Sequence, residues 1–201
     1  MKGHTASHWT FLARLSATLL SIFAFGKIFF MVYNREVMPF SLSDIASVWL
    51  HGFSMDLSTT GYLVVLPWLL SLVCLWAPRL PFRKVLVPYY ILVALVLGLV
   101  ICGDAFLYEF WKFKLNAAVF SYMQSASGTT NSVSPFFLLT RTAAFIVAIG
   151  LIGYLLIRIT PSHLSATAHR IRHSAAMVVL GGLIFLCIRG SIGTSTMNVG
   201  V

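Results

Sequence analysis

The sequence predicts an all-α integral membrane bundle of five transmembrane helices, and three observations lead to this fold class. Of the 201 residues, 59% are hydrophobic and 9% are charged, whereas soluble domains carry about a quarter charged residues. The mean hydropathy is +0.90. The apolar residues also gather in five runs, each near the roughly 20 residues that a spanning helix needs. A water-soluble fold of this size could not cover so much apolar surface, so we predict a multi-pass membrane protein.

The predicted spans follow one another along the whole chain, which forms one transmembrane domain over residues 1–201. They cover about residues 11–33, 57–76, 85–102, 136–159 and 174–188. Pro67 predicts a kink in the second span, which a bundle tolerates when a neighbour satisfies the freed carbonyl. A further helix over about residues 106–123 is expected to lie flat in the interface, because Tyr108, Trp111 and later apolar residues recur at helical spacing.

The basic residues predict the orientation of the bundle. The N-terminus and the loops after the second and fourth spans share one side and carry eight of the fourteen Lys and Arg residues: Lys2, Arg14, Arg79, Arg83, Lys84, Arg158, Arg170 and Arg172. The positive-inside rule places this side in the cytoplasm, so the N-terminus is inside and the C-terminus outside. The net charge of +9 follows this loop pattern rather than one helix face, which argues against a nucleic-acid partner.

All five acids fall on the opposite side, namely Glu36, Asp44, Asp56, Asp104 and Glu109. Asp56 precedes the second apolar run, where its carboxylate would cap the first turn of the helix and suit the positive end of its dipole. An alternative is that Asp56 also anchors a basic partner at an outer-leaflet site. Asp104 and Tyr108 stand four residues apart and therefore share a helix face.

Basic residues also stand near the predicted outer ends of the spans, where an unpaired charge close to hydrocarbon is costly. One interpretation is a ring of ion pairs that locks the bundle, with Asp56, Asp104 and Glu109 opposite Arg141, Arg189 and Lys114. The other is a basic pocket for a lipid phosphate, in which the acids hold the cations in place. The candidate residues are Arg189, Arg141, Lys114 and Lys112 as phosphate contacts, and Asp56, Asp104 and Glu109 as orienting carboxylates.

Catalytic and metal-binding motifs are absent from the sequence. His169 and His173 stand four apart, a spacing that zinc sites use, but no third ligand accompanies them. No HExxH, phosphate-binding glycine loop or GxSxG occurs. We therefore assign no catalytic residue and no metal ligand to this chain.

Three stretches together resemble a known family: HGFSMDLSTTGYLVVLP, GDAFLYEFWKFKLN and RGSIGTSTMN. They look like the membrane half of lipoteichoic acid synthase-like proteins of the sulfatase/alkaline-phosphatase superfamily, most similar to the forms of Gram-negative Bacteroidetes. The chain departs from the family at Ser54, where a basic residue is expected, and at Lys114, where arginine is more usual.

The resemblance implies a bacterial cytoplasmic (inner) membrane protein of the cell envelope. In the family, a catalytic domain outside the cytoplasm holds a metal, usually manganese and sometimes zinc or magnesium, and a threonine nucleophile. It transfers a phosphoglycerol-type headgroup from a membrane phospholipid to an acceptor. This chain ends where the linker to that domain should begin, so we expect the catalytic domain to be attached C-terminally or encoded separately.

The leading functional hypothesis is therefore a membrane-anchoring domain that presents a lipid donor to a transferase. A first alternative is the membrane domain of a phosphoethanolamine transferase. Further alternatives are a small transporter and a structural assembly module. A transporter would carry polar residues near the middle of several spans, whereas here Lys27 is the main exception and is expected to snorkel outward.

Overall fold

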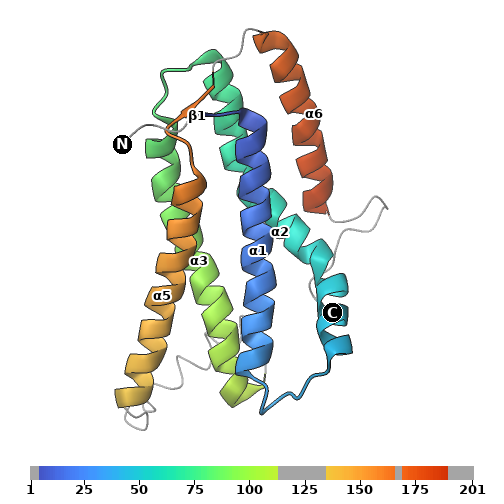
Figure 1. Ribbon diagram of the computed structural model, residues 1–201, viewed down its shortest axis with the longest axis vertical. Helices are drawn as coiled ribbons and strands as arrows, with labels where there is room; N and C mark the ends of the chain where they lie inside the picture. Colours follow the sequence, from blue (N-terminus) through green and yellow to red (C-terminus); the bar gives the residue numbers. More distant parts are fainter. Residues whose placement is uncertain (1–4, 113–134, 166–168, 190–201) are drawn as a thin grey trace.

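Five helices make up most of the computed structural model, which describes residues 5–112, 135–165 and 169–189 (Figure 1). The helices are α1 His8–Tyr33, α2 Leu42–Trp76, α3 Phe82–Trp111, α5 Pro135–Ile159 and α6 Arg170–Arg189. Each is long and apolar enough to cross a membrane. The all-α class and the five apolar helices predicted from the sequence are confirmed at this level.

A short parallel strand pair closes one end of the bundle. Strand β1, Thr5–Ala6, pairs with β2, His163–Leu164, so that Thr5 lies opposite His163. This pairing ties the segment before α1 to the connection after α5. We call this end, with the α2–α3 turn at residues 77–81, the basic end. The opposite end, with the α1–α2 loop and the start of α5, is the acidic end.

Helix α2 begins fifteen residues earlier than the sequence predicted, so the predicted start near Leu57 is wrong. Ser41 and Asp44 form a capping box at the observed start, and the Ser41 backbone N–H donates to Asp44 Oδ2 (2.7 Å). Asp56 therefore lies well inside the helix and is not its cap. The 35 residues of α2 span about 50 Å at roughly 1.5 Å per residue, more than the roughly 30 Å of hydrocarbon in a bilayer.

The first part of α2 accounts for the excess length. Polar residues such as Ser47 and His51 are interspersed there with exposed apolar residues such as Leu42, Trp49 and Phe53. This mixture suits the boundary between lipid and water. The same mixture is why the segment did not stand out from the sequence as part of a long apolar helix.

The first part of the interfacial helix expected over residues 106–123 belongs to α3 and does not form a separate helix. Residues 106–111 continue α3 without a break, and Lys112 caps the helix in the left-handed conformation (φ 59°). The rest of the expected helix, together with Lys114, lies outside the described residues.

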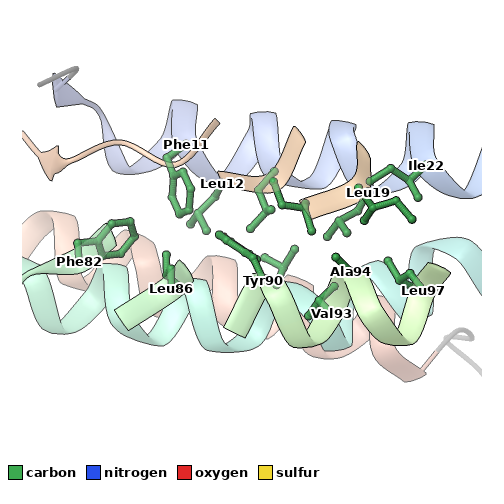
Figure 2. Close-up of a cluster of buried hydrophobic side chains, with 14 of the residues drawn as sticks. Phe11, Leu12, Leu19, Ile22, Phe82, Leu86, Tyr90, Val93, Ala94 and Leu97 are labelled. Atoms are coloured by element: carbon green, nitrogen blue, oxygen red, sulfur yellow. The ribbon is translucent and has the colours of Figure 1, made fainter. Parts of the chain in front are cut away.

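The larger of the two buried clusters among the described residues lies between α1 and α3 (Figure 2) and also includes residues of α2, α5 and α6. Its members from α1 and α3 include Phe11, Leu12, Leu19, Ile22, Phe82, Leu86, Tyr90, Val93, Ala94 and Leu97. The rings of Phe11 and Phe82 meet edge to face, with centroids 5.2 Å apart. Because lipid tails are as apolar as these side chains, close packing rather than escape from solvent favours this contact inside a membrane.

Small residues let the helices approach closely on both sides of this cluster. A Cβ at Gly98 of α3 would approach the backbone nitrogen of Ile149 in α5 to 3.3 Å. A Cβ at Gly61 of α2 would approach Ile188 Cγ1 in α6 to 2.9 Å. Glycine at these positions therefore sets the spacing of the α3–α5 and α2–α6 pairs.

The proline inside α2 has the partner that the sequence analysis required. Pro67 cannot donate to the carbonyl of Leu63, four residues earlier. The Tyr89 hydroxyl of α3 donates to that carbonyl oxygen over 2.9 Å. A neighbouring helix therefore satisfies the freed carbonyl, which is the condition under which a bundle tolerates such a proline.

Candidate functional site

An ion pair joins α1 and α2 in the half of the bundle nearer the acidic end. Lys27 Nζ lies 2.5 Å from Asp56 Oδ2, and the two side chains are 21% and 15% exposed. Both residues lie within apolar spans, where an isolated charge is costly, so each stabilises the other. The sequence analysis expected Lys27 to snorkel outward, and one of its interpretations set Asp56, Asp104 and Glu109 opposite Arg141, Arg189 and Lys114. The partner that the structure shows for Asp56 is Lys27, which that interpretation did not include.

A glycine makes room for the ion pair. Gly52 stands four residues before Asp56 and therefore shares its helix face. A Cβ at Gly52 would contact Lys27 Nζ and would lie 3.0 Å from its Cε. Lys27 thus lies across the bare backbone of α2 to reach the carboxylate one turn further on.

The ion pair lines a cleft of about 380 Å³ between α1, α2 and α3. Asp104 of α3 lines the same cleft, so one ammonium and two carboxylates meet there. Apolar side chains form most of the remaining wall, including those of Phe23, Phe30, Met31, Val48, Val100 and Ile101. Asp104 and Tyr108 both line the cleft, as their four-residue spacing predicted. The cleft is therefore an apolar site with a few charged groups, which is the usual make-up of a small-molecule site.

A second polar cluster connects α1, α3 and α5 at the acidic end. Glu109 Oε2 accepts hydrogen bonds from the Tyr33 hydroxyl (2.6 Å) and from Arg141 Nη2 (2.8 Å). The Glu109–Arg141 ion pair is one of the pairings that the sequence analysis considered, and it is confirmed. Bonds between charged partners are stronger than neutral ones, so this cluster holds the start of α5 against the end of α3.

Aromatic rings surround the guanidinium of Arg141. Its Cζ lies 4.8 Å from the ring centroid of Tyr33, and 4.6 Å from those of Phe106 and Phe137. Cations bind favourably over such ring faces, more strongly where water is excluded. Arg141 is thereby neutralised and enclosed by the protein itself, which fits the ion-pair interpretation better than a phosphate contact.

A buried amide fixes the relative position of α1 and α3 near these clusters. Asn34 is 1% exposed, and its Nδ2 donates to the carbonyl oxygens of Phe30 (3.1 Å) and Ala105 (3.2 Å). Because Ala105 adjoins Asp104, this contact sets how far α3 reaches along α1. The wall of the cleft that carries Asp104 is therefore held in place by α1.

The remaining candidate residues do not gather in the cleft. Arg189 ends α6, which packs on α2, and Ser58 Oγ donates to the neighbouring Ile188 carbonyl oxygen (2.8 Å). Arg141 belongs to α5, which packs on α3. Lys112 Nζ donates to the Glu109 backbone oxygen (3.1 Å). The described residues that line the cleft include none of these three cations.

Comparison of the chain with family models, with curated proteins and with solved structures gave no match. Across residues 5–112, 135–165 and 169–189, no group of three or more His, Cys, Asp or Glu side chains lies close enough together to hold a metal ion. The cleft and the charges around it are therefore the features of this chain that bear on its function.

Sequence reasoning missed three residues that build the site: Lys27, Gly52 and Tyr33. Lys27 stood out as a charge inside an apolar span, but its place in the site was not predicted. The available signal was its opposite charge to Asp56 on the next helix, together with a glycine one turn before that acid. Predicting the pair from this signal would have required the correct start of α2, because that start determines how far along the helix Asp56 lies.

Proposed function

We propose that this chain is a multi-pass membrane protein whose cleft holds the headgroup of a phospholipid. In this proposal the acidic end faces away from the cytoplasm of a bacterial inner membrane. The single observation that carries it is the cleft of about 380 Å³, which combines apolar walls with Lys27, Asp56 and Asp104. An amphiphile needs both kinds of surface, because its chains are apolar and its headgroup is charged.

The residues of the cleft would divide the work of binding. Lys27 carries three N–H donors, of which one bonds to Asp56, so the others would be available to a phosphate oxygen. Asp56 would keep the ammonium oriented while the phosphate binds. Asp104 would accept hydrogen bonds from the polar tail of the headgroup. Acyl chains would leave the cleft along the exposed apolar side chains of its wall, such as Val100.

Such a site would serve a transferase by presentation. A headgroup held at a fixed place beside a catalytic centre reacts as if it were highly concentrated. With the resemblance to lipoteichoic acid synthase-like proteins, we propose that this chain is the lipid-donor-presenting domain of a phosphoglycerol-type transferase. Manganese, zinc or magnesium and the nucleophile would belong to a catalytic domain outside the cytoplasm.

One observation favours a second donor, phosphoethanolamine. The carboxyl groups of Asp56 and Asp104 both line the cleft beside Lys27, and a carboxylate is a natural partner for an ammonium group. A headgroup with its own ammonium would offer these carboxyl groups a charged partner, whereas phosphoglycerol adds only hydroxyls to its phosphate. Both proposed donors would bind in the same cleft, so the two proposals differ in which lipid should bind more tightly.

The experiment is lipid binding by the purified chain, with phosphatidylglycerol and phosphatidylethanolamine compared by native mass spectrometry. Val100→Trp fills the cleft and should lower the affinity for the preferred lipid by about tenfold, which corresponds to about 1.4 kcal/mol. Val96→Trp is the matched control, because Val96 is exposed on the same helix one turn earlier and is not among the residues that line the cleft. Equal binding by both variants would reject the cleft as the lipid site.

A second measurement identifies the headgroup. If Asp104 meets the ammonium of phosphoethanolamine, Asp104→Asn should reduce the preference for phosphatidylethanolamine over phosphatidylglycerol. If Asp104 meets glycerol hydroxyls, the amide remains a hydrogen-bond partner and the preference should stay nearly constant. Arg35→Gln provides a control for charge changes at the acidic end, since Arg35 is exposed in the α1–α2 loop.

A further inference from the structure

A second cavity, of about 530 Å³, lies at the basic end of the bundle. It is lined by Pro81, Arg83, Lys84, Val87, Ser162 and His163. Four of these residues come from the start of α3 and its preceding turn, and two from the connection after α5. The cavity is at the opposite end of α3 from Asp104 and does not share a residue with the cleft.

Both walls of this cavity are held in place by other parts of the fold. On one side Phe82, 1% exposed, anchors the start of α3 against Phe11 of α1 (Figure 2). On the other side His163 belongs to β2, which pairs with β1 and also contacts α3. The side chains of Arg83, Lys84 and His163 are therefore presented from fixed backbone rather than from a loose loop.

The cations at this cavity have no acidic counterpart at their end of the protein. The chain contains five side-chain carboxylates, and all five belong to the described residues. Two of them pair with cations at the other end, Asp56 with Lys27 and Glu109 with Arg141. Glu36, Asp44 and Asp104 also lie on that side. The positive charge around the cavity therefore calls for an anion from outside the chain.

We propose that this cavity binds a phosphate group, through Arg83 and Lys84 with Ser162 and His163 as further hydrogen-bond partners. Arginine and lysine are the usual phosphate partners, and basic pockets between membrane helices on the cytoplasmic side are typical sites for anionic lipid headgroups. The cavity opens at the start of α3, whose helix dipole adds to the attraction. The phosphate belongs either to a lipid of the adjacent leaflet or to a soluble phosphorylated molecule.

The test measures binding of phosphatidic acid, phosphatidylcholine and glycerol phosphate to the purified full chain, by native mass spectrometry and by calorimetry. The double variant Arg83→Gln/Lys84→Gln should weaken binding of the phosphate ligand by about 25-fold, since each basic residue near a membrane surface contributes about fivefold. The charge-retaining variant Arg83→Lys/Lys84→Arg should bind within about threefold of the unchanged protein.

The matched control is Arg79→Gln/Arg170→Gln, which removes the same charge from the same end at exposed residues that do not line the cavity. This control should lose less than about threefold. An equal loss in the control would overturn the proposal. Equal binding of the zwitterionic phosphatidylcholine and the anionic phosphatidic acid by the unchanged protein would also overturn it, because the cavity is proposed to attract an anionic phosphate.

Competition separates the two sources of phosphate. If glycerol phosphate displaces phosphatidic acid, the site takes soluble ligands, and if it does not, the site takes a lipid headgroup. The proposal is independent of the cleft near the acidic end, because Val100→Trp should leave this binding unchanged. A melting temperature for each variant confirms that the loss does not come from unfolding.

Discussion

The two ends of this bundle use positive charge in different ways. At the acidic end, Lys27 and Arg141 each pair with a carboxylate from another helix. At the basic end, residues such as Arg79, Arg83 and Arg170 have no side-chain carboxylate near them, because all five acids lie toward the other end. These two charges at the acidic end therefore connect helices, whereas the arginines at the basic end are directed toward water, phosphate or the membrane surface.

Removal of Asp56 should have the largest effect on stability, because it leaves a charge at the acidic end unpaired. Asp56→Ala leaves the Lys27 ammonium without its partner between two apolar helices, so we expect a loss of about 3 kcal/mol in the free energy of unfolding. Unfolding in mixed micelles, followed by circular dichroism, measures it. Lys27→Met/Asp56→Leu removes both charges and should recover most of the loss. No recovery in this double variant would show that packing, not charge, accounts for the effect.

The second cluster at the acidic end should give a smaller effect, because it is more exposed. Glu109→Gln removes the charge from the bond to Arg141 while the three rings still hold the guanidinium. We expect a loss of about 1.5 kcal/mol. A double-mutant cycle with Arg141→Gln should report a coupling of about 1 kcal/mol. Additive effects of the two changes would contradict the pairing.

A single hydroxyl provides a finer test of the same cluster. Tyr33→Phe removes the 2.6 Å hydrogen bond to Glu109 Oε2 and keeps the ring over Arg141. We expect a loss of about 1 kcal/mol, the usual contribution of one hydrogen bond. Tyr62→Phe is the matched control, since Tyr62 is 63% exposed, and its unfolding should not change. A similar loss at both positions would mean that the Glu109 contact contributes nothing.

The basic end should give the smallest change in stability. Arg79→Gln and Arg83→Gln remove cations that pair with no carboxylate of the chain, so each should alter the free energy of unfolding by less than about 0.5 kcal/mol. The same micelle titration applies. Losses comparable to that of Asp56→Ala would show that these arginines hold the fold, and the contrast between the two ends would then disappear.

The sequence was sufficient to predict the helices but not all of their contacts. The five apolar runs were visible because lipid-spanning length and composition are local properties. The Glu109–Arg141 pair was among the predicted pairings, since both residues were placed at the same predicted end of the bundle. The start of α2 was missed because the segment from Leu42 to Asp56 mixes apolar with polar residues and resembles a loop.

The Lys27–Asp56 pair was missed for a different physical reason. Its partners lie on successive helices, and whether they meet depends on the length of the intervening loop and on the depth of each residue. Neither the loop length nor the depth of Asp56 can be predicted correctly when α2 is assigned the wrong start. The cleft depends on the same geometry, because Asp104 joins Lys27 and Asp56 only after α3 is positioned by Asn34.

The bond from Tyr89 to the Leu63 carbonyl bears on the order in which the protein is assembled. Until α3 is beside it, α2 would expose the unsatisfied Leu63 carbonyl oxygen to the lipid chains, which is unfavourable. The turn between α2 and α3 is short, so Tyr89 comes close to the Leu63 carbonyl as soon as α3 packs against α2. During synthesis, α2 and α3 should therefore leave the insertion machinery together as a hairpin, and Tyr89→Phe should delay that release.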